Sequence, residues 1–196
     1  MRVVIPGLAE AVAKEQSLRD GAFVDVPALA GGIILEPLTI RRLLILETCG
    51  DPFTCGGKVS AGDVARFLWV CSPGFTTTDR KKRDAFIKAC AKMDAVETVK
   101  EIRAHVERAF FDAPQGGSAD AGQSTTSFAA SLVDVFASEY GWAEEAILDL
   151  PLPRAFQYLR KIQKRHDPKG LQSNPLSDRV KGDFLRGLNA KANEKN

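Results

Sequence analysis

Apolar residues recur at helical spacing through the middle of the chain. Between residues 38 and 46, leucines and isoleucines follow at short intervals, and Thr39 stands where an N-cap is expected. Residues 60–71 begin with Ser60, and Asp63 follows at the spacing of a capping box. Apolar residues then fall at i, i+3, i+4 and i+7, namely Val64, Phe67, Leu68 and Cys71. Both segments are predicted to be helices.

The longest helical pattern runs from about residue 79 to residue 111 and contains neither Gly nor Pro. Its apolar stripe advances by three or four residues at every step, through Phe86, Cys90, Met93, Val96, Val99, Ile102, Val106 and Phe110. The spacing predicts one helix of roughly nine turns.

The remaining segments have other patterns. Residues 1–36 place short apolar runs between Gly and Pro, which predicts an N-terminal arm that is either extended or a small β-hairpin. Residues 113–126 are rich in Gly, Ser, Ala and Asp and predict a flexible linker or long loop. Residues 127–196 return to helical spacing and end in a basic tail. We therefore expect a mainly α protein: a helical bundle at 37–112 built around the 79–111 helix, with a helical C-terminal extension.

Composition and charge place the chain among soluble globular proteins. It has 196 residues, of which 44% are hydrophobic and 27% charged, and its net charge is +2. No apolar run approaches the roughly 18 residues of a membrane span, and the N-terminus lacks the pattern of a signal peptide. The expected location is the cytoplasm. The last 43 residues carry 11 Lys and Arg against 4 Asp and Glu, whereas residues 1–153 carry 16 against 21.

The cysteines, histidines and glycine-rich stretches do not form a recognisable catalytic or cofactor motif. Cys49 and Cys55 are too widely spaced for a Cys-x2-Cys zinc knuckle, and neither histidine is near them in the sequence. "CGGK" at 55–58 lacks the Gly-Lys-Ser/Thr ending of a phosphate loop. We therefore predict no catalytic residue, no metal site, no cofactor and no enzymatic activity, and interpret the cysteines mainly as buried apolar residues.

An aromatic, amphipathic stretch at 140–162 is the main candidate for contact with another protein. It could pack on the rest of the bundle, or it could present a helix to the groove of a partner. The candidate partner-binding residues are Trp142, Leu150, Leu152, Phe156 and Leu159.

Two groups of cations could form a basic surface. They are Arg80, Lys81, Lys82 and Arg83 in the first group and Arg160, Lys161, Lys164 and Arg165 in the second. Nucleic-acid binding would require several such contacts and steep salt dependence. Solvated helix surfaces are the simpler interpretation, and a nucleic-acid partner is not expected.

Two stretches resemble proteins encoded among the tail genes of tailed bacteriophages. "PLTIRRLLILETCGDPFTCGGKVSAGDVARFLWVCSPGF" is similar to a pattern of two helices separated by a "PF…GG" turn, in which the second helix ends at Ser-Pro. "YGWAEEAILDLPLPRAFQYLR" resembles a second element, in which Gly-Trp precedes an acidic helix. Together they cover about a third of the chain, and the long linker and the basic tail are not part of the pattern.

The resemblance implies a tail assembly chaperone. Such proteins are mostly helical, hold no cofactor and bind the hydrophobic helices of the tape-measure protein in the host cytoplasm. The alternatives are a structural component of the virion tail or neck, and a nucleic-acid-binding accessory factor.

Overall fold

The fold is mainly α, as the periodicity predicts. A computed structural model describes residues 13, 16–17, 19–24, 27–113 and 127–166. The predicted linker (but for residue 113), the basic tail beyond residue 166 and most of residues 1–26 lie outside the described residues. The elements are η1 (Gly21–Phe23), β1 (Ala28–Ala30), β2 (Ile33–Leu35), α2 (Ile40–Thr48), α3 (Pro52–Cys55), α4 (Ala61–Cys71), α5 (Arg80–Cys90), α6 (Ala95–Ala109), α7 (Phe128–Tyr140), α8 (Glu144–Leu148) and α9 (Leu152–His166).

The predicted helix starts are confirmed at α2 and α4. The Thr39 hydroxyl accepts a hydrogen bond from the backbone N–H of Arg42, which caps α2. At α4, Ser60 accepts from the N–H of Asp63 while the Asp63 carboxylate accepts from the N–H of Ser60. This reciprocal pair is a capping box and satisfies two otherwise free N–H groups.

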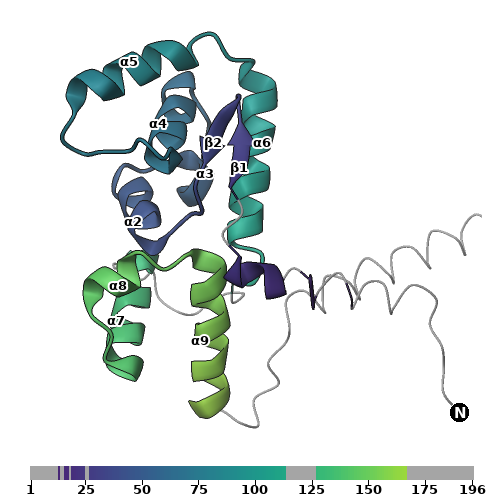
Figure 1. Cartoon of the computed structure of the whole chain (residues 1–196), viewed down its shortest axis with the longest axis vertical. Helices are drawn as coiled ribbons and strands as arrows, with labels where there is room; N and C mark the ends of the chain where they lie inside the picture. The colour runs from purple at the N-terminus through teal and green to yellow at the C-terminus, as the bar shows by residue number, and fades with distance from the viewer. Residues whose placement is uncertain (1–12, 14–15, 18, 25–26, 114–126, 167–196) are drawn as a thin grey trace, which may run out of the picture.

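The single helix predicted over 79–111 is wrong. The chain forms two helices there, α5 and α6, separated by a turn at residues 91–94. The Asp94 carboxylate accepts hydrogen bonds from the N–H groups of Val96 and Glu97 at 2.9 and 3.1 Å, and so caps a new helix. Val96, a member of the predicted stripe, is 69% exposed. Figure 1 shows α5 lying over α4, while α6 runs along the hairpin.

Residues 28–35 form a small hairpin, one of the two arrangements that the sequence allowed, and this hairpin packs in the core. β1 and β2 are antiparallel, with Leu29 opposite Ile34. Ala30 and Leu35 are fully buried. In the turn, Gly31 has a φ of +56° and donates its N–H to Glu101 of α6 at 2.7 Å.

The C-terminal helices share one hydrophobic core with the rest of the chain. Leu43 and Leu46 of α2 belong to the same buried cluster as Leu132 and Phe136 of α7. A short antiparallel bridge adds backbone contacts: the N–H of Leu152 donates to Leu38 at 2.9 Å, and the N–H of Ile40 donates to Leu150 at 3.1 Å. Residues 127–166, the described part of the predicted extension, therefore pack as part of the main body.

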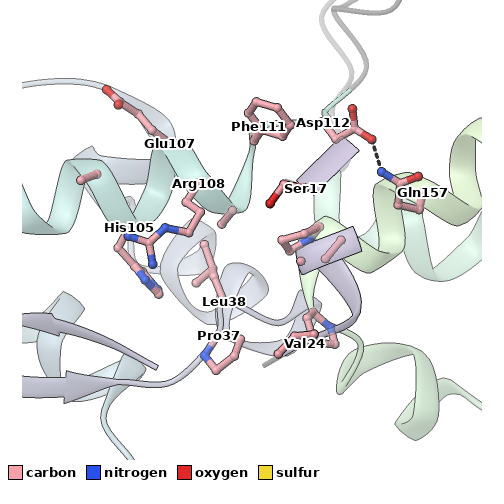
Figure 2. A pocket seen from close by; sticks show the side chains of 16 residues that line it. Ser17, Val24, Pro37, Leu38, His105, Glu107, Arg108, Phe111, Asp112 and Gln157 are labelled. Atoms are coloured by element: carbon pink, nitrogen blue, oxygen red, sulfur yellow. Dashed lines mark hydrogen bonds between the residues drawn. The ribbon is translucent and has the colours of Figure 1, made fainter. Parts of the chain in front are cut away.

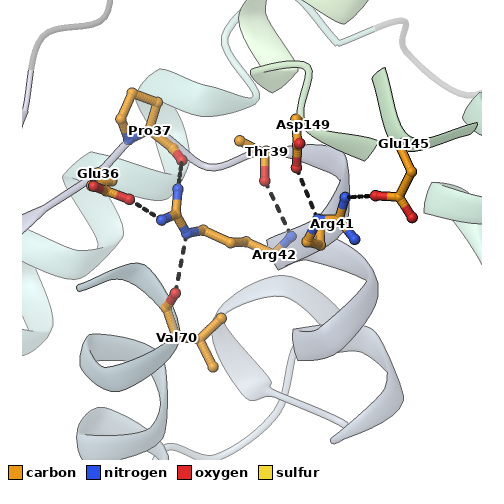
Figure 3. Close-up of polar contacts among 8 residues, drawn as sticks. All are labelled: Glu36, Pro37, Thr39, Arg41, Arg42, Val70, Glu145 and Asp149. Carbon is orange, nitrogen blue, oxygen red and sulfur yellow. Dashed lines mark hydrogen bonds and ion pairs between the residues drawn. The ribbon is translucent and has the colours of Figure 1, made fainter. Parts of the chain in front are cut away.

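Two adjacent arginines of α2 reinforce this packing (Figure 3). Arg42 donates to the carbonyl oxygen of Val70 at 3.1 Å, which holds the end of α4 against α2. Arg41 forms ion pairs with Glu145 and Asp149, at 2.5 and 2.8 Å, and so ties α2 to α8 and the turn after it. None of the helices formed by the described residues combines the length and apolar character needed to cross a bilayer.

Candidate functional site

The aromatic segment at 140–162 packs on the body, the first of the two arrangements that the sequence allowed. Leu152 and Phe156 are fully buried, and Trp142, Leu150 and Leu159 are partly buried. Leu152 and Phe156 therefore offer no accessible surface in this structure, and the other three side chains are covered in part. Replacing Leu152 or Phe156 would disturb the core before it disturbed any interface.

Trp142 is held by neighbouring rings. It stacks on Tyr140 with 4.7 Å between ring centroids and meets Tyr158 edge to face at 5.3 Å. The guanidinium of Arg165 lies over the ring of Tyr140 at 5.0 Å. These contacts join the end of α7 to α9.

The two groups of predicted basic residues do not form one surface. The four cations at the start of α5 are all exposed, and Figure 1 shows α5 and α9 at opposite ends of the molecule. On α9, Arg160 forms an ion pair with buried Asp112, and Arg165 pairs with Glu139 at 3.2 Å. Lys161 and Lys164 are exposed.

A pocket of about 520 Å³ lies where α6, α9 and η1 meet the chain segments around residues 37 and 152 (Figure 2). This volume falls within the range of ligand-binding sites. The wall is mainly apolar and is formed by Ala22, Val24, Pro37, Leu38, Ala104, Ala109, Phe111, Pro151 and Pro153. Sequence reasoning missed this pocket because its walls come from four distant segments. No local pattern marks it.

Polar groups are concentrated on the α6 side of the pocket. In Figure 2, Arg108 extends from α6 toward the pocket beside His105, whereas Glu107 points away. On the opposite side, Gln157 donates a hydrogen bond to Asp112. The lining of the pocket therefore includes one cationic side chain, that of Arg108, beside an apolar surface.

His105 contributes a buried, neutral ring. Its side chain is 5% exposed, and Nε2 has no hydrogen-bond partner among the described residues. Burial lowers its pKa from 6.5 to about 4, and the nearby charges of Arg108 and Arg42 act in the same direction. The imidazole packs edge to face with Phe67 at 6.3 Å between centroids. At neutral pH it carries no charge.

The expectation that the cysteines are buried holds for Cys71 and is wrong for Cys49 and Cys55. Cys71 is fully buried, and burial raises the pKa of its thiol to about 12, so the thiolate does not form at neutral pH. Cys49 and Cys55 are exposed free thiols at the turn between α2 and α4. Within the described part of the chain, no three His, Cys, Asp or Glu side chains come together in a way that could hold a metal ion.

Comparison of the chain with protein-family models, with curated proteins and with solved structures finds no match.

Proposed function

We propose that the chain is a non-enzymatic assembly protein of tailed bacteriophages, a chaperone or adaptor that binds hydrophobic helices of a tape-measure-like partner. The observation that supports this best is the apolar pocket between α6 and α9. The resemblance of residues 37–75 and 140–160 to tail assembly proteins supplies the class of partner.

The pocket suits an apolar side chain projecting from a partner helix. Pro37, Pro151 and Pro153 form part of its wall, and their rings restrict the backbone, so the wall is stiff before binding. Burying a Leu or Phe side chain completely contributes about 1.5–3 kcal/mol. Several such contacts along one helix are needed for a stable complex.

Filling the pocket tests this proposal. Ala104 lies on α6, is exposed and lines the pocket, so Ala104→Trp would occupy the pocket without replacing a core residue. The adjacent Arg103 is also exposed but does not line the pocket, which makes Arg103→Trp a matched control. Each form would be co-expressed with the tape-measure protein of the same tail gene cluster.

We expect the wild type and Arg103→Trp to co-purify with the partner and keep it soluble, and Ala104→Trp to lose it. Retention by Ala104→Trp would show that the pocket is not the contact site. A wild type that never co-purifies with a tail protein would refute the proposed function. Mass spectrometry of mature phage particles distinguishes a chaperone from a structural component, because a structural component is present stoichiometrically and a chaperone is absent.

A further inference from the structure

Helix α5 packs against α4 along one side and buries little of its own surface. None of its residues is buried, and Phe86 and Cys90 are the two side chains that pack against the core. An isolated helix of 11 residues is marginal in water, so the helical state of α5 depends on its contact with α4. Segments with few buried apolar contacts open at low free-energy cost.

Beneath α5, the surface of α4 includes the large apolar side chain of Trp69, which is 5% exposed. The indole of Trp69 contacts the ring of Phe86 at 5.2 Å and the ring of Phe75 at 5.9 Å between centroids. If α5 moved away, one side of the Trp69 ring would lose its cover.

The charge of α5 weakens this attachment and indicates a partner. The helix contains five cations and one acid, and Arg80, Lys81, Lys82 and Arg83 crowd its first turn, where the helix dipole disfavours positive charge. Among the described residues, Arg83 with Asp84 is the one ion pair that these cations form. An acidic chain approaching α5 would meet unpaired positive charge.

We propose that the face of α4 around Trp69 is a second protein-binding surface, which α5 covers in this structure and which an acidic amphipathic helix of a partner occupies when α5 is displaced. The contact between α5 and α4 demonstrates that this face accepts a helix bearing a large apolar residue. The cations of the displaced α5 then pair with the acids of the bound helix. This surface is separate from the pocket between α6 and α9.

Opening of α5 can be measured on the protein alone. The sequence contains two tryptophans, so a Trp142→Phe background leaves Trp69 as the single fluorescent indole. In this background, Phe86→Ala removes the ring that covers Trp69, and Ile87→Ala, at a neighbouring residue that is 41% exposed, is the control. We expect acrylamide quenching of Trp69 to rise about threefold in Phe86→Ala and to stay unchanged in Ile87→Ala. The helical circular dichroism should be retained in Ile87→Ala and should fall in Phe86→Ala by no more than the 11 residues of α5 contribute. Unchanged quenching in Phe86→Ala would overturn the proposal, as would a rise that occurs only with global unfolding.

The chemistry of the partner is tested with two capped 15-residue peptides that have Leu at helical spacing and either Glu or Lys at the other positions. We expect the Glu peptide to bind the full chain, the Lys peptide not to bind, and Phe86→Ala to bind the Glu peptide about tenfold more tightly, because its face is already open. Ala104→Trp should bind the Glu peptide as the wild type does. Equal binding of both peptides, or loss of binding in Ala104→Trp, would contradict the proposal. If the Glu peptide binds but no tail protein co-purifies with the chain, the proposed function is refuted and the second binding surface is not.

Discussion

The stability of Asp51→Asn, measured relative to the wild type, should be higher at neutral pH than at acid pH. The Asp51 side chain is fully buried; one carboxylate oxygen accepts the N–H of Phe53 at 3.0 Å, and the other has no hydrogen-bond partner among the described residues. Burial raises the pKa of this carboxyl from 3.8 to about 6, and the hydrogen bond from Phe53 and the charge of Arg66 only partly oppose the rise. Asn keeps the acceptor for Phe53 and removes the charge.

The sign and size of the effect follow from proton linkage. Because the folded state holds this proton more tightly than the unfolded state, ionisation of Asp51 lowers stability. The loss begins near the unfolded pKa of 3.8 and is complete above the folded pKa of about 6. At 1.4 kcal/mol for each pH unit, we expect the free energy of unfolding of Asp51→Asn to gain about 2 kcal/mol on the wild type between pH 4 and pH 7.5. The unpaired amide N–H groups of Asn subtract about 1–3 kcal/mol at every pH and do not alter this difference.

Urea denaturation followed by circular dichroism measures the effect at each pH. Comparing variant and wild type at the same pH cancels the contribution of His105, whose lowered pKa has the opposite effect on stability. Asp134→Asn, which changes an exposed carboxylate on α7, is the control and should follow the wild type at every pH. If Asp51→Asn differs from the wild type by the same amount at pH 4 and pH 7.5, the carboxyl is not a buried, unpaired acid.

Three further predictions concern packing and titration. Gly31→Ala should lower stability by about 1–3 kcal/mol more than Gly32→Ala, because a Cβ on Gly31 would lie 2.6 Å from the sulfur of Met93, whereas one on Gly32 meets open space; equal thermal midpoints would contradict this. Phe156→Ala should cost about 3–5 kcal/mol in urea denaturation, since the ring is fully buried, and a near-neutral result would place Phe156 outside the core. Because the pKa of His105 is lowered by burial, the folded protein loses stability as pH falls from 6.5 toward 4. The free energy of unfolding of the wild type should therefore fall by about 2 kcal/mol relative to His105→Gln between pH 7 and pH 5, and parallel pH profiles would refute this.

Local signals in the sequence were sufficient for most helices. The apolar positions Val64, Phe67, Leu68 and Cys71 are all buried on α4, and Ser60 caps this helix as predicted. Capping and helical periodicity depend on residues a few positions apart, so they can be recognised without knowledge of the fold.

The break between α5 and α6 shows where periodicity is insufficient. A stripe with steps of three and four residues continues across the turn at 91–94 because the turn itself occupies about one helical repeat. Asp94 followed by Glu97 is an N-cap pattern of the same kind as Ser60 followed by Asp63, and this signal predicts the second helix start. In the sequence, this N-cap signal lies within an apolar stripe that continues on both sides of the turn, and the stripe alone predicts one helix.

The candidate sites were the least predictable part. Trp142 and Phe156 are aromatic residues of the kind that often form contact surfaces. Packing against α7 and the body of the molecule covers Trp142 in part and Phe156 completely. The pocket and the covered face of α4 arise from contacts between distant segments, to which a single sequence gives no direct signal.

The most direct test of the proposed function is co-purification of the full chain with the tape-measure protein of its own gene cluster, for the wild type, Ala104→Trp and Arg103→Trp side by side. Our account predicts a soluble complex with the wild type and with Arg103→Trp, and free, aggregating partner with Ala104→Trp. Absence of a complex in all three forms, with each protein folded by circular dichroism, would contradict it.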